Sequence, residues 1–529
     1  MIQVRSLIIY LSLVCSLFQS CKNKQGSHDQ GMPENIPIAE QVGVAPMPDS
    51  IAAITAPFPM EDLKKPVFPE RTESISDLGA KEGMLVTTII QQGIDELSKN
   101  GGGRLLVPKG KWKTGRISLK SNVDLHLAVG AELHFSGAIE DYLPVVFTRN
   151  EGVEVMSLGA CIYANNQQNI AVTGKGKLIG PGEGSVRKQI MTQEVIENVV
   201  SHVKPVNERI YDGKDGSFIF PPMFIAPINC TNVLIEGISL ERTAFWNIVP
   251  QYCDQVIIRG VTIHSVGIPR GDGIDIESSR NVLIEYCTLQ TGDDCLAMKA
   301  GRGWDGLRVS RPTENVVVRY CFAEKGHGGI TIGSETAGMV RNLYVHDCVF
   351  NNEGTGIRFK TRRPRGGGGA QLFYDRIRMR VGETALRWDM LGSAVHVGAA
   401  ANRSNTVAVN ELTPHFNDIK ISNLIIEDAT HFMRVDGIPE APLEKVQIRH
   451  VKAKTEKLFD IKDARDITIE NAEFTSQDSV LHLVNTQDIS FSKVSFDIPA
   501  KKVYQHVATD GGDSVVLKDV RYTKIEGME

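Results

Sequence analysis

Three aspartates in the middle of the chain have the type and spacing needed for proton chemistry. Asp272 stands in a Gly-Asp-Gly motif, and Asp293-Asp294 follows 21 residues later in a Gly-Asp-Asp-Cys motif. Three carboxylates held close together cannot all ionise cheaply, so at least one pKa is expected to rise. A protonated carboxyl group beside an ionised one is the requirement for glycoside hydrolysis. The same residues could instead bind calcium or cap strands as polar turns.

A histidine lies one repeat further along the chain. His327 stands between glycines, 34 residues after Asp293, and the segment 301–312 reads as an inserted loop that accounts for the extra length. With the loop set aside, His327 falls on the coil next to the aspartates. That position favours a functional imidazole over a structural one, and the flanking glycines would let a bulky partner approach it.

Cations form the last part of this constellation. Arg358 and Lys360 are two residues apart, so on a strand they point to the same side and could grip a carboxylate. Lys299 and Arg270, which lie near the aspartates, are further candidates for binding substrate. A solvated basic loop or a nucleic-acid patch is the alternative, because three more arginines follow at positions 362, 363 and 365.

A short repeat must position these residues. A polar residue, often Asn, precedes alternating residues rich in Val and Ile and then a turn; the phrase starts at residues 122, 169, 232, 255, 281, 315, 342, 418, 445, 466 and 488. The period-two alternation predicts strands. Strands that recur every 20-odd residues without long helices between them predict a parallel β-helix. Leucine-rich repeats have a similar period, but the positions that they reserve for Leu hold Val and Ile here.

Two further patterns fit this coil. Residues 87–97 are spaced as an amphipathic helix that ends near three glycines, and such a helix would cap the open end of the β-helix. Cys287, Cys321 and Cys348 each lie six residues after the start of their repeat, as expected for a buried ladder of small side chains. A metal or redox site is the less favoured interpretation of these cysteines, because no CxxC pair is present.

Composition limits the class of protein. Of the 529 residues, 42% are hydrophobic and 23% are charged, which excludes wholesale disorder. The formal net charge is −5, so a dispersed basic coat for nucleic acid is not expected.

The amino terminus predicts export. Arg5 precedes a short apolar run over residues 7–18, which is too short to span a bilayer and is typical of a secretory signal. The run ends in a segment similar to a lipobox, in which Cys21 would be lipidated. We therefore expect a lipoprotein-type signal at residues 1–20, a tether and amino-terminal extension at 21–80, and an all-β catalytic domain at 81–529. Residues 22–57 lack periodicity and read as the tether.

Taken together, the four motifs around Asp272, Asp293-Asp294, His327 and Arg358-Lys360 resemble the signature of family 28 glycoside hydrolases, the polygalacturonases. The sequence between residues 80 and 430 is similar to the bacterial exo-acting branch of this family. The resemblance implies a right-handed, single-stranded parallel β-helix of the pectin-lyase-like type. It also implies inverting hydrolysis of α-1,4-galacturonosyl linkages in pectin or oligogalacturonides.

The resemblance implies roles for the acidic residues. Asp293 would be the general acid that protonates the glycosidic oxygen, Asp272 and Asp294 would activate the water, and His327 would tune or relay protons near the acid. An inverting enzyme is expected to hold its acid and base carboxyl groups about 6.5–9.5 Å apart, which leaves room for the water.

The resemblance also implies what the protein binds. Arg358 and Lys360 would hold the galacturonate carboxylate, and the chemistry requires no metal or organic cofactor. We expect an exported, periplasmic or outer-membrane-anchored lipoprotein of a Gram-negative bacterium that touches the membrane only through its lipid. We also expect a monomer whose partner is a pectic polysaccharide.

Three alternatives remain open from the sequence. One is a pectate lyase, which uses calcium and an arginine base on the same fold. Another is a hydrolase for a different pectin, such as rhamnogalacturonan or xylogalacturonan. The third is a non-catalytic glycan-binding β-helix, which the three gathered acids disfavour because a binder of anionic glycans would avoid them. We expect exo action, for which the insertions at 181–218 and 301–312 are the candidates to close one end of the cleft, while the sequence assigns no role to the insertion at 392–410.

Overall fold

The computed structural model describes residues 33–201, 204–405, 407–507 and 515–525. The expected signal at 1–20, Cys21 and the first part of the tether lie outside the described residues. Within the described ranges, no helix combines the length and the apolar character needed to cross a bilayer.

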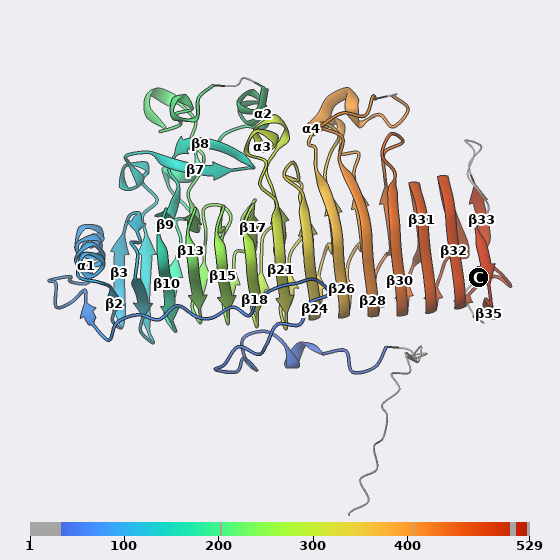
Figure 1. The fold of residues 1–529 in the computed structure, drawn as a ribbon, viewed down its shortest axis with the longest axis horizontal. Coiled ribbons are helices and arrows are strands. Elements are labelled where there is room, and N and C mark those ends of the chain that lie inside the picture. The colour runs from blue at the N-terminus through green and yellow to red at the C-terminus, as the bar shows by residue number, and fades with distance from the viewer. Residues whose placement is uncertain (1–32, 202–203, 406, 508–514, 526–529) are drawn as a thin grey trace, which may run out of the picture. The chain divides into compact units, whose positions relative to one another are not determined.

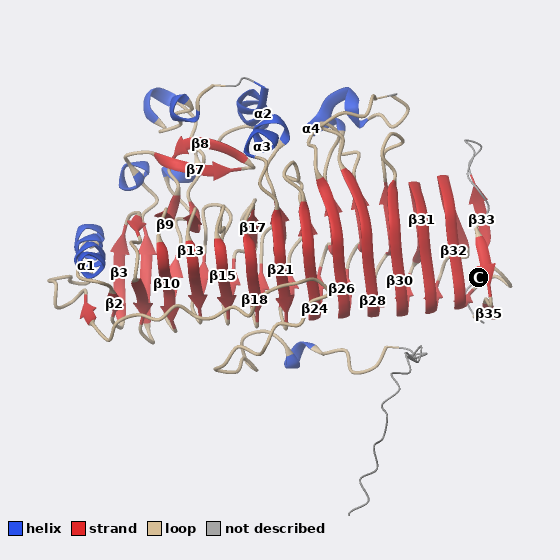
Figure 2. Ribbon diagram, in the orientation of Figure 1, coloured by secondary structure: helices blue, strands red, loops and turns tan. Residues whose placement is uncertain are grey.

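Short parallel strands wind into the predicted right-handed β-helix (Figures 1 and 2). The strands stack in columns, and each strand pairs with its counterpart one coil later. One column, here called the site column, contains β17 (Ile274–Glu277), β20 (Leu296–Lys299), β23 (Gly328–Ile332), β25 (Thr355–Lys360), β27 (Thr384–Asp389), β29 (His431–Asp436), and the first parts of β31 (Lys457–Ser476) and β32 (Val480–Ile498), followed by β33 (Tyr504–Val507).

A second column carries the repeat phrases recognised in the sequence. It contains β2 (Gly103–Val107), β5 (Val123–Leu127), β10 (Gln168–Gly174), β13 (Thr231–Glu236), β15 (Asp254–Arg259), β18 (Arg280–Glu285), β21 (Thr313–Arg319), β24 (Val340–Asn352), β26 (Gly368–Val381), β28 (His415–Asp428) and β30 (Leu443–Thr455). A third, shorter column contains β3 (Gly110–Thr114), β6 (Ala131–Phe135), β11 (Lys177–Ile179), β14 (Ser239–Glu241), β16 (Thr262–His264), β19 (Thr288–Gln290) and β22 (Phe322–Lys325).

The structure explains why a polar residue starts each phrase. Asn281, Asn315 and Asn342 all adopt positive φ angles between 52° and 55°, a left-handed conformation that Asn tolerates better than most residues. Their side chains also form a ladder: Asn315 donates to Asn281 at 3.1 Å and Asn342 donates to Asn315 at 2.9 Å. The turn residue therefore both bends the chain and links neighbouring coils.

The predicted cap and cysteine ladder are present. Helix α1 (Thr87–Lys99) buries Ile90, Ile94 and Leu97 against the first coils, which it covers at one end of the molecule (Figure 1). The seven described cysteines are all buried and free. They fill the interior of the coil as small apolar side chains.

The extension before the β-helix is not a free tether over its described part. Phe58 and Leu63 pack on the outer face of the second column. Arg319 donates to the carbonyls of Ala52 and Ala53 at 2.7 and 3.1 Å, and Arg259 binds the carbonyl of Pro48 at 2.7 Å. Residues 33–57, expected as a tether, therefore lie along the coil, because arginines on the strands satisfy the carbonyl groups of a segment without secondary structure of its own.

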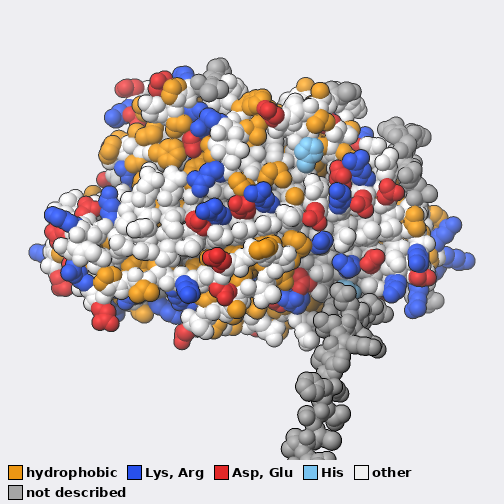
Figure 3. Space-filling view, viewed as in Figure 1, with side chains coloured by type: hydrophobic (Ala, Val, Ile, Leu, Met, Phe, Trp, Pro, Cys, Tyr) orange, Lys and Arg blue, Asp and Glu red, His pale blue; other side chains and the backbone are white. Residues whose placement is uncertain are grey.

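Two of the three insertions build a cover above one edge of the coil. The hairpin of β7 (Val146–Asn150) and β8 (Val153–Ser157) lies with α2 (Gln193–Ser201) and α3 (Gly303–Val309) near the amino-terminal half (Figure 1). Helix α4 (Ala394–Val397), from the third insertion, lies on the same edge nearer the carboxyl-terminal half. On the face drawn in Figure 3, acidic and basic side chains are interspersed, as expected from the small net charge.

Candidate active site

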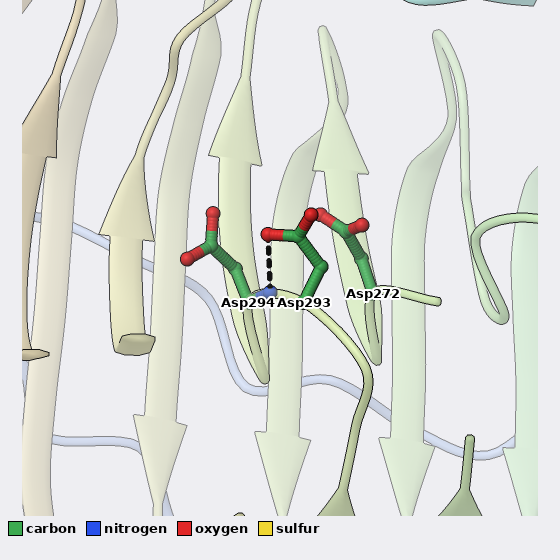
Figure 4. Close-up of side chains that lie close together, drawn as sticks. All are labelled: Asp272, Asp293 and Asp294. Atoms are coloured by element: carbon green, nitrogen blue, oxygen red, sulfur yellow. Dashed lines mark hydrogen bonds between the residues drawn. The ribbon is translucent and has the colours of Figure 1, made fainter. Parts of the chain in front are cut away.

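The three aspartates come together at the start of two neighbouring strands of the site column (Figure 4). Asp272 precedes β17, and Asp293 and Asp294 precede β20. One carboxylate oxygen from each residue lies within 4.8 Å of the others. Because β17 and β20 pair in register over four residues, the 21-residue spacing in the sequence becomes one strand spacing in the structure.

The spacing of the acids does not by itself decide the stereochemistry of the reaction. A separation of about 6.5–9.5 Å between carboxyl groups is typical of inverting glycosidases, whereas the closest oxygens here lie within 4.8 Å of one another. The distance therefore does not itself support inversion, which rests on the resemblance.

Asp294 is the ionised member of the cluster. Its side chain is fully buried, and Lys360 donates to its Oδ2 at 2.8 Å while Arg358 Nη1 lies 3.8 Å from its Oδ1. Burial opposes ionisation, but Lys360, Arg358 and Lys299 outweigh it and hold the pKa of Asp294 well below its ordinary value.

Asp272 has the opposite surroundings. It is buried, its Oδ1 has no hydrogen-bond partner among the described residues, and burial together with the nearby carboxylates of Asp275 and Asp293 raises its pKa well above its ordinary value. The cluster thus contains one carboxyl group that keeps its proton and one that does not, as the acid–base chemistry requires.

Lys299 is buried and does not lie at the surface of the groove, where a substrate-binding residue was expected. Its side chain is 3% exposed, and its Nζ lies 3.3 Å from Glu335, 3.5 Å from Asp275 and 3.8 Å from Asp272. The same ammonium lies over the ring of Trp246, 4.5 Å from its centre. Lys299 therefore compensates buried acids from below the groove.

His327 opens toward solvent beside the third aspartate. Its Nδ1 lies 3.5 Å from Asp293 Oδ1, and the two side chains are 66% and 28% exposed, the highest values in the cluster. The carboxylate of Asp293 raises the pKa of His327 above its ordinary value. Helix α3 takes up the 301–312 insertion, so the backbone of His327 donates directly to the Asp293 carbonyl at 3.0 Å.

Gly328 makes room for Asp294, whereas the sequence suggested that it gives a partner access to His327. A Cβ atom at this position would lie 2.7 Å from Asp294 Oδ1 and 2.5 Å from Thr331 Oγ1. The missing side chain makes room for the ionised carboxylate rather than for a partner of the imidazole.

Arg270 faces the cover and not the aspartates. Its Nε lies 3.1 Å from Oε1 of Glu151, at the tip of the β7–β8 hairpin. Of the arginines after Lys360, Arg363 pairs with Glu440 and Arg365 pairs with Glu335, each at 2.7 Å. These two arginines are buried in internal ion pairs and do not form a solvated loop or a nucleic-acid patch.

Two acids around the site were not predicted as site residues. Asp275 is fully buried on β17 with neither carboxylate oxygen hydrogen-bonded to a described residue, and burial raises its pKa to about 8. Glu335 binds Lys299, Arg302 and Arg365. The sequence offered one signal for Asp275, an acidic residue between two Ile residues on a buried strand; Glu335 follows an irregular segment and offered none.

The arrangement can move protons beside an anionic sugar. The oxygens are close enough for a shared cation, but Lys299, Arg358 and Lys360 already supply positive charge around the same carboxylates. A site with one protonated acid, one ionised acid and two accessible cations suits hydrolysis of a glycoside that carries a carboxylate.

The sequence of this chain is similar to those of known glycoside hydrolases. The model of the glycosyl hydrolases family 28 matches residues 98–383. A probable polygalacturonase of Vitis vinifera is 28% identical over 397 residues, which cover 72% of this chain and 74% of the relative. An exo-poly-alpha-D-galacturonosidase of Dickeya chrysanthemi is 26% identical and is covered over 62% of its length, with 68% of this chain.

A solved structure supports the same assignment. The hyperthermoactive exopolygalacturonase of Thermotoga maritima is 30% identical, with a TM-score of 0.70 over 78% of this chain and 93% of the other. The family match covers more than half of the chain and spans all the motifs described above. The protein is therefore a glycoside hydrolase that belongs to family 28.

Proposed function

We propose that the protein is an exo-acting polygalacturonase, which hydrolyses α-1,4-galacturonosyl linkages and releases galacturonate from the end of pectic chains. The observation that carries the proposal is the contact between Asp294 and the pair Arg358 and Lys360, which joins an acid cluster to a carboxylate-binding pair in one groove. The substrate class is taken from the names of the relatives. Arg358 and Lys360 give a physical reason for this class, because two cations can bind the carboxylate of a galacturonate unit.

We assign the proton donor and the proton acceptor from the exposure and the charge of the three aspartates. Asp293 is the proton donor in our proposal, because it is the member of the trio that opens into the groove, beside His327. Asp294, kept ionised by its cations, accepts the proton of the attacking water, while Asp272, which keeps its own proton, orients that water through a hydrogen bond. The substrate carboxylate then lies against Arg358, whose Nε has no hydrogen-bond partner among the described side chains.

Exo action is supported by the cover on one side of the site. Glu151 at the hairpin tip is bound by Arg302 at 2.9 Å and by Arg270 at 3.1 Å, and Arg302 also reaches Glu335 at 3.1 Å. This chain of ion pairs links the cover to the acids beneath it, since Glu335 in turn contacts Lys299. We take this cover as the limit of the substrate-binding surface, so that a chain end, and not the middle of a polymer, reaches the acids.

Product lengths test the proposal. Digestion of long and short galacturonans is expected to give monomer from the outset, and a spread of intermediate lengths would refute exo action. Asp293→Asn is expected to lower kcat on oligogalacturonate by about 10²–10⁴-fold, the contribution of a general acid. Unchanged turnover would overturn the assignment of the donor.

The lyase alternative is tested by the same digestion. Elimination would give products with an unsaturated, ultraviolet-absorbing end and would stop when a chelator removes calcium. We expect no new absorbance and full activity in the chelator, because lysine and arginine side chains supply the positive charge at the acids.

We also propose that the protein is exported and anchored through a lipid on Cys21, with residues 1–20 as its signal and residues 81–529 as the catalytic domain, acting as a monomer. The apolar run and the lipobox-like segment support this. Incorporation of labelled palmitate into the full chain, and its loss in Cys21→Ala, would test the anchor.

A further inference from the structure

The site column continues well beyond the catalytic groove, and its outward face is charged. On β25, β27 and β29, every second side chain points into the core, and the alternate positions face outward. Arg358 pairs in register with Arg387, and Arg387 pairs with Arg434. Three arginines thus stack on successive coils, starting from the one that borders Asp294.

The two outer arginines share the counter-ion Asp436, and Arg434 also lies 3.8 Å from Asp460. Asp436 accepts from Arg387 at 2.5 Å, lies 3.6 Å from Arg434 Nε, and is also bound by Lys462 at 3.2 Å. Arg387 Nη1 and Arg434 Nε are buried atoms without a hydrogen-bond partner among the described residues. Lys462 also lies 3.6 Å from Asp460, so three cations face two carboxylates and one positive charge remains for an anionic ligand.

The next coils of the same column form an open groove of about 680 Å³. Its lining includes Lys457, Asp460 and Lys462 on β31 and His482 on β32, with His506 on β33. Asp460 pairs in register with Arg434, so the groove continues the arginine stack. This polar groove also has Glu456 and Asp478 in its lining, and it begins with His431, on the same strand as Arg434.

We propose that Arg387, Arg434 and Lys462 form further subsites, each of which binds the carboxylate of a uronate ring beyond the one held by Arg358 and Lys360. Successive coils are about 4.8 Å apart, a spacing similar to the width of a sugar ring, so one coil serves one ring. The β7–β8 hairpin of the cover lies toward the amino-terminal coils, and we place the rest of the substrate chain on the coils that follow the acids. The inference rests on the proposed function and adds where the uncleaved part of the chain binds.

Chain-length dependence tests the subsites. Galacturonate oligomers of two, four and six units would be compared as substrates of the wild-type protein, Arg387→Gln, Arg434→Gln and the double variant. We expect kcat/KM to rise with length in the wild type, and each substitution to lower it on the hexamer by about 10-fold, as for the loss of a hydrogen bond to a charged group. Turnover of the dimer is expected to stay within about 2-fold of wild type, because the dimer does not reach these coils.

Arg341→Gln is the matched control. Arg341 is a strand arginine paired with Glu314 at 2.7 Å, but it lies on β24 in the second column. Its substitution is expected to leave every chain length unaffected. Lys462→Gln, at a more exposed position, gives a second variant in case the substitution at Arg387 unfolds the protein.

Binding gives an independent readout. In an Asp293→Asn background, Arg434→Gln is expected to weaken hexagalacturonate about 10-fold and digalacturonate not at all. Equal losses on the dimer and the hexamer, or no loss on either, would show that the arginines only pair within the stack and would overturn the subsites. Wild-type protein that cleaves no galacturonide at all would instead overturn the proposed function.

Discussion

At the scale of single residues, the site works by giving chemically identical side chains different charges. Asp272 and Asp294 are both buried and lie on neighbouring coils, yet burial and like charges raise the pKa of Asp272, while Lys360 and Arg358 lower the pKa of Asp294. Neighbours and not residue type thus decide which aspartate holds a proton. Gly328 belongs to the same design, because its bare Cα leaves space for the Asp294 carboxylate.

Substitution of His327 should change how activity depends on pH. The Asp293 carboxylate raises the pKa of His327, so the imidazolium persists above its ordinary range and is lost as pH rises through the raised pKa. If the charged ring supports Asp293, wild-type kcat/KM falls on this basic limb. We expect His327→Gln to lower kcat by about 10²-fold and to abolish the limb in a pH–rate profile. A variant that keeps the wild-type profile would show that another group causes it.

Gly328→Ala tests the space around Asp294. The added methyl group would contact Asp294 Oδ1 and Thr331 Oγ1, so we expect the carboxylate to shift and kcat to fall by at least about 10²-fold, the effect of misplacing a catalytic group by about 1 Å. Circular dichroism should remain that of a folded β-protein. Gly267→Ala, where a Cβ meets nothing within 4 Å, is a control for the methyl group, although its positive φ of 78° adds some backbone strain. Wild-type activity in Gly328→Ala would contradict the explanation of this glycine.

At the scale of elements, the outer faces of the site column and of the second column have different functions. The outer face of the site column carries the acids and the arginine stack, whereas the outer face of the second column is covered by the extension through Phe58 and Leu63. Figure 4 shows the extension behind the strands that bear the three aspartates. An exposed apolar column would favour association, so the extension protects one side of the coil while the other side meets substrate.

Loosening the extension should therefore leave catalysis intact. Leu63→Asp places a charge among Ala171, Leu234 and their neighbours, and we expect a loss of about 2–3 kcal/mol in the binding of the extension. The measurable result is faster proteolysis within residues 33–71, with kcat on oligogalacturonate unchanged. Val67→Asp is the matched control, because Val67 in the same segment is 89% exposed. Equal proteolysis of both variants would show that Leu63 does not fasten the segment.

At the scale of the whole molecule, the buried acids link stability to pH. Burial raises the pKa of Asp275 to about 8 and that of Glu277 to about 7, whereas both groups ionise near pH 4 in an unfolded chain. Between these values the folded protein binds more protons than the unfolded one, so the free energy of unfolding decreases as pH rises from about 4 to 8. The molecule is therefore expected to be most stable on the acidic side of neutrality.

Thermal unfolding at several pH values tests this linkage. Tm is expected to fall between pH 5 and pH 8 in the wild type, and Asp275→Asn is expected to flatten the slope, because the amide does not titrate. Asp466→Asn, at a turn of the repeat on a residue with positive φ, provides a control outside the cluster. A wild-type Tm that rises over this range would contradict the assignment of the buried protons.

The stereochemistry of the product is also a property of the assembled groove. The resemblance implies inversion, although the closest acid oxygens lie nearer to one another than the separation typical of inverting pairs. Proton NMR during the first minutes of digestion should therefore detect the β-anomer of the released sugar first. The α-anomer as first product would indicate retention and a nucleophilic aspartate.

Much of the molecule follows from the sequence, because a coiled repeat turns distance along the chain into distance in space. The period-two phrases predict the strands, their spacing predicts one coil per phrase, and the 21-residue offset predicts that Asp272 meets Asp293-Asp294. The cap at α1 and the cysteine ladder follow from the same local patterns. The catalytic motifs could be recognised because the aspartates and His327 each precede a strand of one column, and Arg358 and Lys360 lie on the next strand of that column.

Only the tertiary structure decided what lies outside that periodicity. The burial of Lys299 below the groove, the pairing of Arg270 with Glu151, and the packing of residues 33–57 on the coil all depend on insertions or extensions whose partners are distant in the sequence. The register that stacks Arg387 and Arg434 on Arg358 depends on loop lengths between coils. Local patterning sets the strands because it acts between neighbours, whereas charge compensation and loop docking depend on contacts that exist only once the coil has formed.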